Sequence, residues 1–285
     1  MKSRPFQQVD VFTATPYRGN PLAVVLDGSG LDDATMQRFA AWTNLSETTF
    51  LLPPTTPAAD YRVRIFTPGG ELPFAGHPTL GSCHVWLAAG GQPRQAGEVV
   101  QESAVGLVRI RRSGTRLAFA APPLRRTDPA PARLAQVARA LGLKPQEIRA
   151  AQLLDNGPVW LALLVDNPQT VLALSPDHAR LRELDAKVGV VHLDASKAGI
   201  DPATPALLVR AFAAPIGVAE DPVTGSLNAS LAQWLIGAGL VSGRYVASQG
   251  ECLGRAGRVF IEQDTDGTTW VGGDVAPCIA GAVLL

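Results

Sequence analysis

The sequence lacks the features that mark several common classes of protein. It contains three cysteines, Cys83, Cys252 and Cys278, which are too few and too scattered for a disulfide framework. Lysine and arginine together number 25, as do aspartate and glutamate, and no polybasic run offers a surface for nucleic acid or for a membrane. The first residues, MKSRPFQQVDVF, include no apolar signal segment. We therefore expect a cytoplasmic protein that binds neither nucleic acid nor a membrane.

Motifs that hold nucleotides or metals in many enzymes are also missing. The sequence has no G-x-x-x-x-G-K-[ST] loop, no G-x-G-x-x-G after an expected strand, no C-x-x-C pair and no H-E-x-x-H. It has no G-x-S-x-G nucleophile motif either. His77, Cys83 and His84 lie close together in the sequence, but a helix would turn them to different faces. We expect no metal site.

The chain does contain enough apolar material for a large core. Hydrophobic residues make up 46% of it and charged residues 18%, which excludes disorder as the main state. Two long stretches, Leu72–Pro93 and Pro222–Gly243, carry no charged residue. Glycine, proline and polar residues interrupt both before they reach the roughly 18 apolar residues of a membrane span. Helices around Thr79–Ala89 and Leu227–Ala238 would have no charged face, and such helices are usually buried.

These two stretches belong to a repeat with a period of roughly 150 residues. Arg64-Ile-Phe66-Thr-Pro68 resembles Arg210-Ala-Phe212-Ala-Ala-Pro215. Further matches follow in the same order: Gly76 with Gly225, Trp86 with Trp234, Gln101 with Gln249, and Gly106 with Gly254. Chance recurrence of common residues is the alternative, but the constant order favours an internal duplication.

A proline-rich segment, Ala121–Pro131, separates the two repeats. Proline neither donates to a sheet nor continues a helix, so this segment is expected to be a linker. We predict an N-terminal lobe of residues 1–122 and a C-terminal lobe of residues 123–285, whose last strand could pack back on the first lobe. Each half contains several expected strands around one buried helix, which makes the fold class α+β.

One further helix is expected over Asp32–Trp42. Asp32 is suited to cap its N-terminus. Apolar residues recur at helical spacing, so one face should be buried. That face is expected to carry Leu31, Thr35, Phe39 and Trp42.

The strongest local signals for function lie at the starts of the two buried helices. They read Glu71-Leu-Pro-Phe-Ala-Gly76-His77-Pro78-Thr79 and Glu220-Asp221-Pro222-Val-Thr224-Gly225-Ser226. The start of a helix leaves backbone N–H groups unpaired and carries a partial positive charge, and a glycine lets a ligand approach the backbone closely. Gly76 and Gly225 therefore predict two anion sites that face one cleft and suit a carboxylate. The alternative is that Gly and Ser only cap the helices.

Four polar residues could act on such a ligand. Glu47, between a helix and a strand, is a candidate general base, although most glutamates are solvated surface charges. His77 and Asp221 lie at the two helix starts and could exchange protons with a substrate, although a lone histidine is more often a capping or core residue. Asn20, in the turn Gly19-Asn20-Pro21, could bind a ligand, but turn geometry alone also explains it.

Together these residues resemble a known family. The motifs are Val9-Asp10-Val11-Phe12-Thr13, Gly19-Asn20-Pro21, Asn44-Leu-Ser-Glu47-Thr48, Phe66-Thr-Pro68, Ala75-Gly76-His77-Pro78-Thr79-Leu80, Glu220-Asp221-Pro222-Val-Thr224-Gly225-Ser226 and Gln249-Gly250. In this order, from Val9 to about Ile261, they are similar to the PhzF-type phenazine-biosynthesis isomerases, which belong to the diaminopimelate epimerase superfamily.

The resemblance implies two pseudo-symmetric lobes, each a barrel-like, mostly antiparallel sheet around a central helix, and it implies a homodimer. The implied activity is a cofactor-independent isomerisation of a small cyclic amino acid, trans-2,3-dihydro-3-hydroxyanthranilate. Glu47 would be the catalytic acid/base, with His77 and Asp221 as the assisting polar pair. The residues that would bind the substrate and its carboxylate are Asn20, Gly76, Gly225 and Ser226.

One departure from the wider superfamily bears on the mechanism. Its epimerases use two opposed cysteines, one at each helix start, whereas this sequence has Ala75 and Thr224 before the two glycines. A single carboxylate that takes a proton and returns it therefore fits better than two thiols. Two alternatives stay open at this point: an isomerase of a different small metabolite, and a non-catalytic protein that binds a carboxylate metabolite.

Overall fold

The computed structural model describes residues 1–197 and 199–285, which form two compact units. Unit 1 consists of Met1–Ala120 together with Gly272–Leu285, and unit 2 consists of Ala121–Val271. The last segment of the chain therefore belongs with the first part of the chain. Among the described residues, no helix has both the length and the apolar composition that crossing a bilayer requires.

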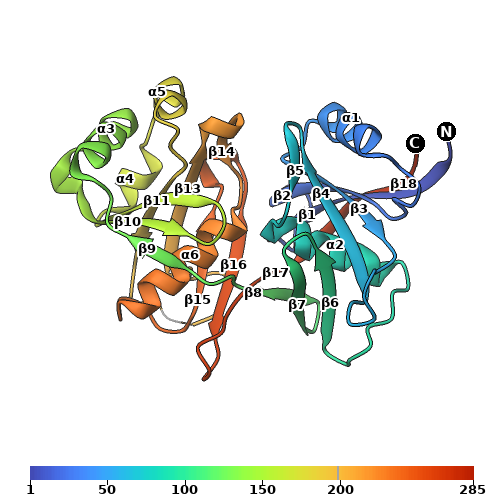
Figure 1. Cartoon of the computed structure of the whole chain (residues 1–285). Coiled ribbons are helices and arrows are strands. Elements are labelled where there is room, and N and C mark those ends of the chain that lie inside the picture. The colour runs from blue at the N-terminus through green and yellow to red at the C-terminus, as the bar shows by residue number, and fades with distance from the viewer. Residues whose placement is uncertain (198) are drawn as a thin grey trace. The chain divides into compact units, whose positions relative to one another are not determined.

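Unit 1 is built on one mostly antiparallel sheet (Figure 1). Its strands are β1 (Ser3–Val11), β2 (Asn20–Val25), β3 (Glu47–Leu52), β4 (Tyr61–Thr67), β5 (Gly70–Leu72), β6 (Glu98–Ser103), β7 (Gly106–Ser113), β8 (Arg116–Ala120) and β18 (Val275–Leu284). Among the paired strands of the described part of this unit, only β2–β3 and β4–β6 are parallel. Helix α2 (Gly76–Ala88) packs against β1, β2, β3, β6, β8 and β18, so the sheet wraps around it. Helix α1 (Asp33–Thr43) packs against β3 and β4.

Unit 2 repeats this plan. Its strands are β9 (Arg125–Thr127), β10 (Ile148–Asp155), β11 (Val159–Val165), β12 (Val188–Leu193), β13 (Leu207–Ala213), β14 (Val218–Asp221), β15 (Arg244–Gln249), β16 (Gly257–Gln263) and the first three residues of β17 (Thr269–Gly273), whose last two residues belong to unit 1. Helix α6 (Gly225–Gly237) is its central helix and packs against β10 and β16. The outer helices are α3 (Pro131–Leu141), α4 (Pro168–Leu172) and α5 (His178–Glu183).

The internal duplication is visible in the strand pairing. In unit 1, β1–β2 is antiparallel, β2–β3 parallel, β3–β4 antiparallel and β4–β6 parallel. In unit 2, β10–β11, β11–β12, β12–β13 and β13–β15 follow the same succession. Each central helix follows a short strand that pairs with the fourth strand of this succession: β5 pairs with β4 before α2, and β14 pairs with β13 before α6. The predicted α+β class, with one helix inside each barrel-like sheet, is confirmed.

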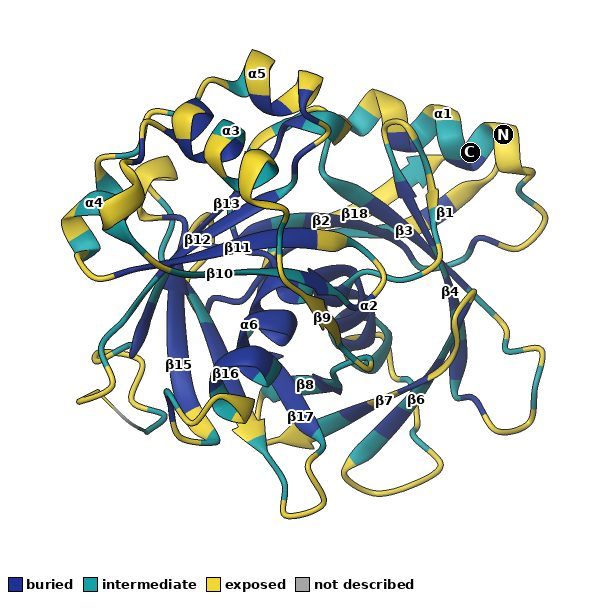
Figure 2. Cartoon of the chain, turned by 60° about the vertical axis from the view of Figure 1, so that its left-hand side comes forward, coloured by how far each residue is buried: buried dark blue, intermediate teal, exposed yellow. Residues whose placement is uncertain are grey.

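Both central helices are buried, as their lack of charge predicts. Figure 2 shows α2 and α6 in the colour of buried residues. Close packing depends on glycine at two points: a Cβ on Gly81 would lie 2.5 Å from Leu22 Cδ2, and one on Gly189 would lie 2.6 Å from Leu227 Cδ1. Helices α2 and α6 begin at Gly76 and Gly225, slightly earlier than predicted, and Pro78 is tolerated because the first turn needs no N–H from it.

The predicted face of α1 is wrong in one respect. Asp32 caps the helix as expected and accepts a hydrogen bond from the Thr35 amide at 2.8 Å. The fully buried side chains, however, are Met36 and Ala40, while Trp42 is 81% exposed. Met36 and Ala40 share a cluster with Val25, Phe50 and Phe66. Contact with these strands, rather than the size of the apolar residues, decides which stripe of the helix is inside.

Two loop predictions also need correction. Asn20 was expected in a turn, but β2 begins at this residue, which pairs with Val11. The turn ends at Gly19, where a Cβ would lie 2.2 Å from the Val11 carbonyl oxygen. The proline-rich linker is not wholly irregular, because Arg125–Thr127 forms β9 and pairs with β10.

Candidate functional site

In unit 1, the fold brings together two of the predicted catalytic residues. Glu47 is the first residue of β3, and His77 is the second residue of α2. Glu47 Oε2 lies 3.3 Å from His77 Nε2, and the two side chains are only 14% and 6% exposed. A carboxyl group and an imidazole thus meet inside the protein beside the N-terminus of the central helix.

Burial keeps the imidazole of His77 neutral. Loss of solvent lowers its pKa to about 3, and a hydrogen bond to the backbone of Pro21 opposes that effect. Proline has no N–H, so the ring must donate to the Pro21 carbonyl. His77 Nε2 makes no hydrogen bond within the described chain, so the nitrogen that donates to Pro21 is Nδ1. In the neutral ring Nε2 then carries no proton and can only accept a hydrogen bond. Nε2 is therefore available to accept a hydrogen bond from the Glu47 carboxyl when that carboxyl is protonated.

Strand register places Asn20 on the same face as Glu47. Leu22 is the register partner of Glu47 in the parallel pair β2–β3, and Asn20 lies two residues before Leu22. Side chains two residues apart in a strand point to one face. Leu22 contacts Gly81 of α2, so this face looks toward the central helix, where Asn20 is fully buried.

A buried network supports the N-terminus of α2. Thr79 Oγ1 donates to the Ala75 carbonyl at 2.9 Å and accepts from Gln101 Nε2 at 3.2 Å. Tyr61 donates to Gln101 Oε1 at 2.8 Å. In the described chain no group accepts from the amide of Gly76. With the partial positive charge of the helix, this amide is suited to an anionic ligand.

Gln249 supports the N-terminus of α6 in a matching way. Its Oε1 accepts from the Thr224 amide at 3.1 Å and from Asn228 Nδ2 at 2.9 Å. Its Nε2 donates to Thr224 Oγ1 and to the Asp221 carbonyl. Thr224 Oγ1 in turn donates to Asp221 Oδ2 at 2.6 Å. The first amides of the helix, beginning with Gly225, take no part in this network, and the N-terminal amides of a helix have no partner within the helix.

Ser226, in the first turn of α6, is positioned by two residues that the sequence did not indicate. Trp160 Nε1 donates to Ser226 Oγ at 3.1 Å, and Asn156 Nδ2 donates to the Ser226 carbonyl at 3.0 Å. Because Trp160 occupies an acceptor position of the hydroxyl, the hydroxyl proton is free to be donated to an anion. No sequence signal pointed to Trp160 or Asn156, whereas Gln101 and Gln249 already stood out as a matched pair.

The repeated arginines also make matching contacts. Arg64 forms a two-point ion pair with Glu71, at 2.7 and 2.6 Å. Arg210 does the same with Glu220, at 3.0 and 2.7 Å. Each guanidinium also lies 5.0 Å from the ring centre of the phenylalanine two residues later. These pairs fix the short strands that lead into α2 and α6.

The predicted site residues therefore fall into two sets. Unit 1 supplies Asn20, Glu47, Gly76 and His77, and unit 2 supplies Asp221, Gly225 and Ser226. The expected pairing of His77 with Asp221 stays a prediction. Within the described residues there is no cluster of three or more metal-binding side chains.

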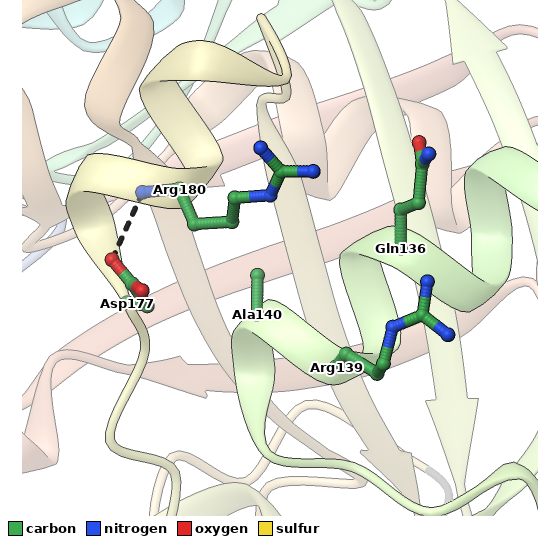
Figure 3. A pocket seen from close by; sticks show the side chains of 5 residues that line it. All are labelled: Gln136, Arg139, Ala140, Asp177 and Arg180. Atoms are coloured by element: carbon green, nitrogen blue, oxygen red, sulfur yellow. Dashed lines mark hydrogen bonds between the residues drawn. The ribbon is translucent and has the colours of Figure 1, made fainter.

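A separate hollow lies on the surface of unit 2, between α3 and α5. It has a volume of about 150 Å³ and is lined by Gln136, Arg139, Ala140, Asp177 and Arg180 (Figure 3). Asp177 accepts a hydrogen bond from the Arg180 amide, and the Arg180 side chain pairs with Glu183. None of the predicted site residues lines this hollow.

Sequence comparison finds relatives over nearly the whole chain. The family described as phenazine biosynthesis-like protein, PhzC-PhzF, matches residues 9–281. The protein called antisense-enhancing sequence 1 from Schizosaccharomyces pombe is 35% identical and is matched over 99% of each chain. A trans-2,3-dihydro-3-hydroxyanthranilate isomerase from Pseudomonas fluorescens is 32% identical over 90% of this chain and 89% of its own.

Solved structures agree on the fold. A PhzF-family phenazine biosynthesis protein from Bacillus anthracis superposes with a TM-score of 0.84 at 23% identity, and all of both chains is covered. A probable proline racemase from Agrobacterium radiobacter gives a TM-score of 0.65 at 16% identity, covering 99% of this chain and 93% of its own. At these identities the likeness concerns the fold alone, and it agrees with the predicted diaminopimelate epimerase-like architecture.

Proposed function

The chain belongs to the PhzC-PhzF family of phenazine biosynthesis-like isomerases, and from this premise we propose that it isomerises a small cyclic amino acid without a cofactor. The proposed substrate resembles trans-2,3-dihydro-3-hydroxyanthranilate. The observation that carries this proposal is the buried contact of Glu47 with a neutral His77 beside the N-terminus of α2. A site that only binds a carboxylate has no use for a second carboxyl group there, because like charges repel.

Glu47 is the proposed proton carrier. It removes a proton from one ring carbon of the substrate and returns a proton to another position of the ring, so that the reaction is balanced within one molecule. His77 holds the Glu47 carboxyl in place and accepts from it when it is protonated. Asp221 is the second polar partner of the substrate. A positioned acid–base group of this kind typically contributes about 10²- to 10⁴-fold to the rate.

The backbone at the two helix starts is proposed to hold the substrate. The amides of Gly76 and Gly225 donate to its carboxylate or to charge that develops during proton transfer. The Ser226 hydroxyl adds a donor, and Asn20 is a further polar contact. Ala75 and Thr224 stand where the two-thiol epimerases of this superfamily have cysteines. A single carboxylate therefore both removes the proton and returns it.

Proton NMR in D₂O tests this proposal. With trans-2,3-dihydro-3-hydroxyanthranilate, the wild-type protein should produce the isomer and introduce deuterium into the ring. Glu47→Gln should slow turnover at least about a hundredfold, since it removes the acid–base group. Glu262→Gln, at a half-exposed glutamate of unit 2, serves as the matched control and should leave turnover unchanged.

The outcomes separate the proposal from its alternatives. Full activity of Glu47→Gln would remove this residue from the mechanism. No turnover by the wild-type protein would reject this substrate, and deuterium uptake by other cyclic amino acids would then identify an isomerase of a different metabolite. Binding of these carboxylates without deuterium uptake would instead indicate a non-catalytic binding protein.

A further inference from the structure

A buried amide beside the N-terminus of α6 has a free oxygen, and we infer that this oxygen selects the amino group of the ligand. Asn156 directly follows β10 and is 8% exposed. Its Nδ2 donates to the Ser226 carbonyl in the first turn of α6. Its Oδ1 has no hydrogen-bond partner within the described part of the chain. This inference rests on the proposed function, because it assigns a second group of the same ligand.

Hydrogen-bond chemistry fixes the orientation of this amide. A carbonyl oxygen can only accept, so the atom of Asn156 that meets the Ser226 carbonyl must be Nδ2. The other polar atom of the amide, Oδ1, takes no part in this bond, and it can only accept a hydrogen bond. A buried acceptor without a donor costs about 1–3 kcal/mol. A ligand that brings an N–H group to Oδ1 removes that cost.

The same turn of α6 offers groups of the opposite kind. The amides of Gly225 and Ser226 can donate, and Trp160 leaves the Ser226 hydroxyl proton free to donate as well. Donors for a carboxylate therefore lie next to one acceptor for an N–H group. This combination fits an amino acid whose amino and carboxylate groups are on neighbouring atoms. A carboxylate without the amino group leaves Asn156 Oδ1 unsatisfied and should bind more weakly.

Calorimetric binding of two probes to the full chain tests the inference. 3-Hydroxyanthranilate and 3-hydroxybenzoate differ only in the amino group. The wild-type protein should bind the amino compound at least about tenfold more tightly, as expected for one hydrogen bond to a buried acceptor. Asn156→Leu should weaken only the amino compound and bring the ratio of the two affinities close to one. Gln152→Leu removes an amide of β10 that bonds Asp128 instead, and it should keep the wild-type ratio.

Each other outcome overturns the inference in a different way. Equal affinities in the wild-type protein would show that the amino group is not selected. An equal loss of affinity for both probes in Asn156→Leu would show that Asn156 only positions Ser226. Asn156→Ser, a smaller substitution that also removes the amide oxygen, replaces Asn156→Leu if that variant does not fold. Equal affinities, or binding of neither probe, would overturn the inference. The proposed function is decided separately by deuterium exchange that depends on Glu47, so the two failures are distinguishable.

Discussion

His77 illustrates how its surroundings set the state of a single residue. In the folded protein its pKa is about 3 because the ring is buried, whereas an exposed histidine titrates near pH 6.5. Near neutral pH the ring is therefore uncharged and can face the Glu47 carboxyl as an acceptor. A protonated His77 would add a buried positive charge and would tie up the group that moves the proton.

This difference in pKa predicts how stability depends on pH. Between about pH 6.5 and pH 3 the unfolded chain binds a proton at His77 and the folded chain does not, so the free energy of unfolding falls as the pH is lowered. The expected slope from this residue is about 1.4 kcal/mol per pH unit. Urea unfolding at several pH values from 7 to 4 should show a shallower loss for His77→Gln than for the wild type. Parallel curves for the two proteins would contradict the neutral, buried state.

The central helices matter as elements, because each brings a positive N-terminus into the interior and must pack on every side. Their neutral, small-residue composition allows that packing. Gly81 shows how little space is left beside α2, because a Cβ added there would lie 2.5 Å from Leu22 and 3.0 Å from Val11. Leu22 is the register partner of Glu47, so the spacing between α2 and β2 also affects where Glu47 lies.

Two glycines of the central helices should therefore respond in opposite ways to alanine. Gly81→Ala gains helix propensity but forces Leu22 to move, and we expect a net loss of about 1–2 kcal/mol in the free energy of unfolding. Gly237→Ala, at the end of α6 with no atom within 4 Å of the new Cβ, should be neutral or stabilising by up to about 1 kcal/mol. Urea denaturation measures both. A stabilised Gly81→Ala would show that α2 is less tightly packed than these distances indicate.

At the scale of the whole molecule, we propose that the chain forms a homodimer. The argument rests mainly on the family, and exposed apolar side chains on β18, Ile279 and Leu284, are consistent with a covered surface. Light scattering after size exclusion should give about twice the mass of the 29.9 kDa chain. A mass close to that of one chain at every concentration would reject the dimer.

Much of the architecture was already predictable from local signals. The charge-free stretches identified both central helices, and the ordered matches between the halves identified a duplication that the strand pairing reproduces. Asp32 was correctly assigned as a cap. The buried face of α1 was not, because Trp42 stacks on Phe39 but stays 81% exposed, whereas Met36 packs in the cluster with strand residues Val25 and Phe50.

The sequence by itself determined the family, the α+β class and the residue types at the two helix starts, since periodicity, charge and short motifs are read within one stretch of chain. Only the tertiary structure decided that Glu47 meets His77 and that Trp160 and Asn156 hold Ser226. These partners are far apart in the sequence. Their contacts depend on strand register and on how deeply each helix is buried, and neither of these leaves a local pattern in the chain.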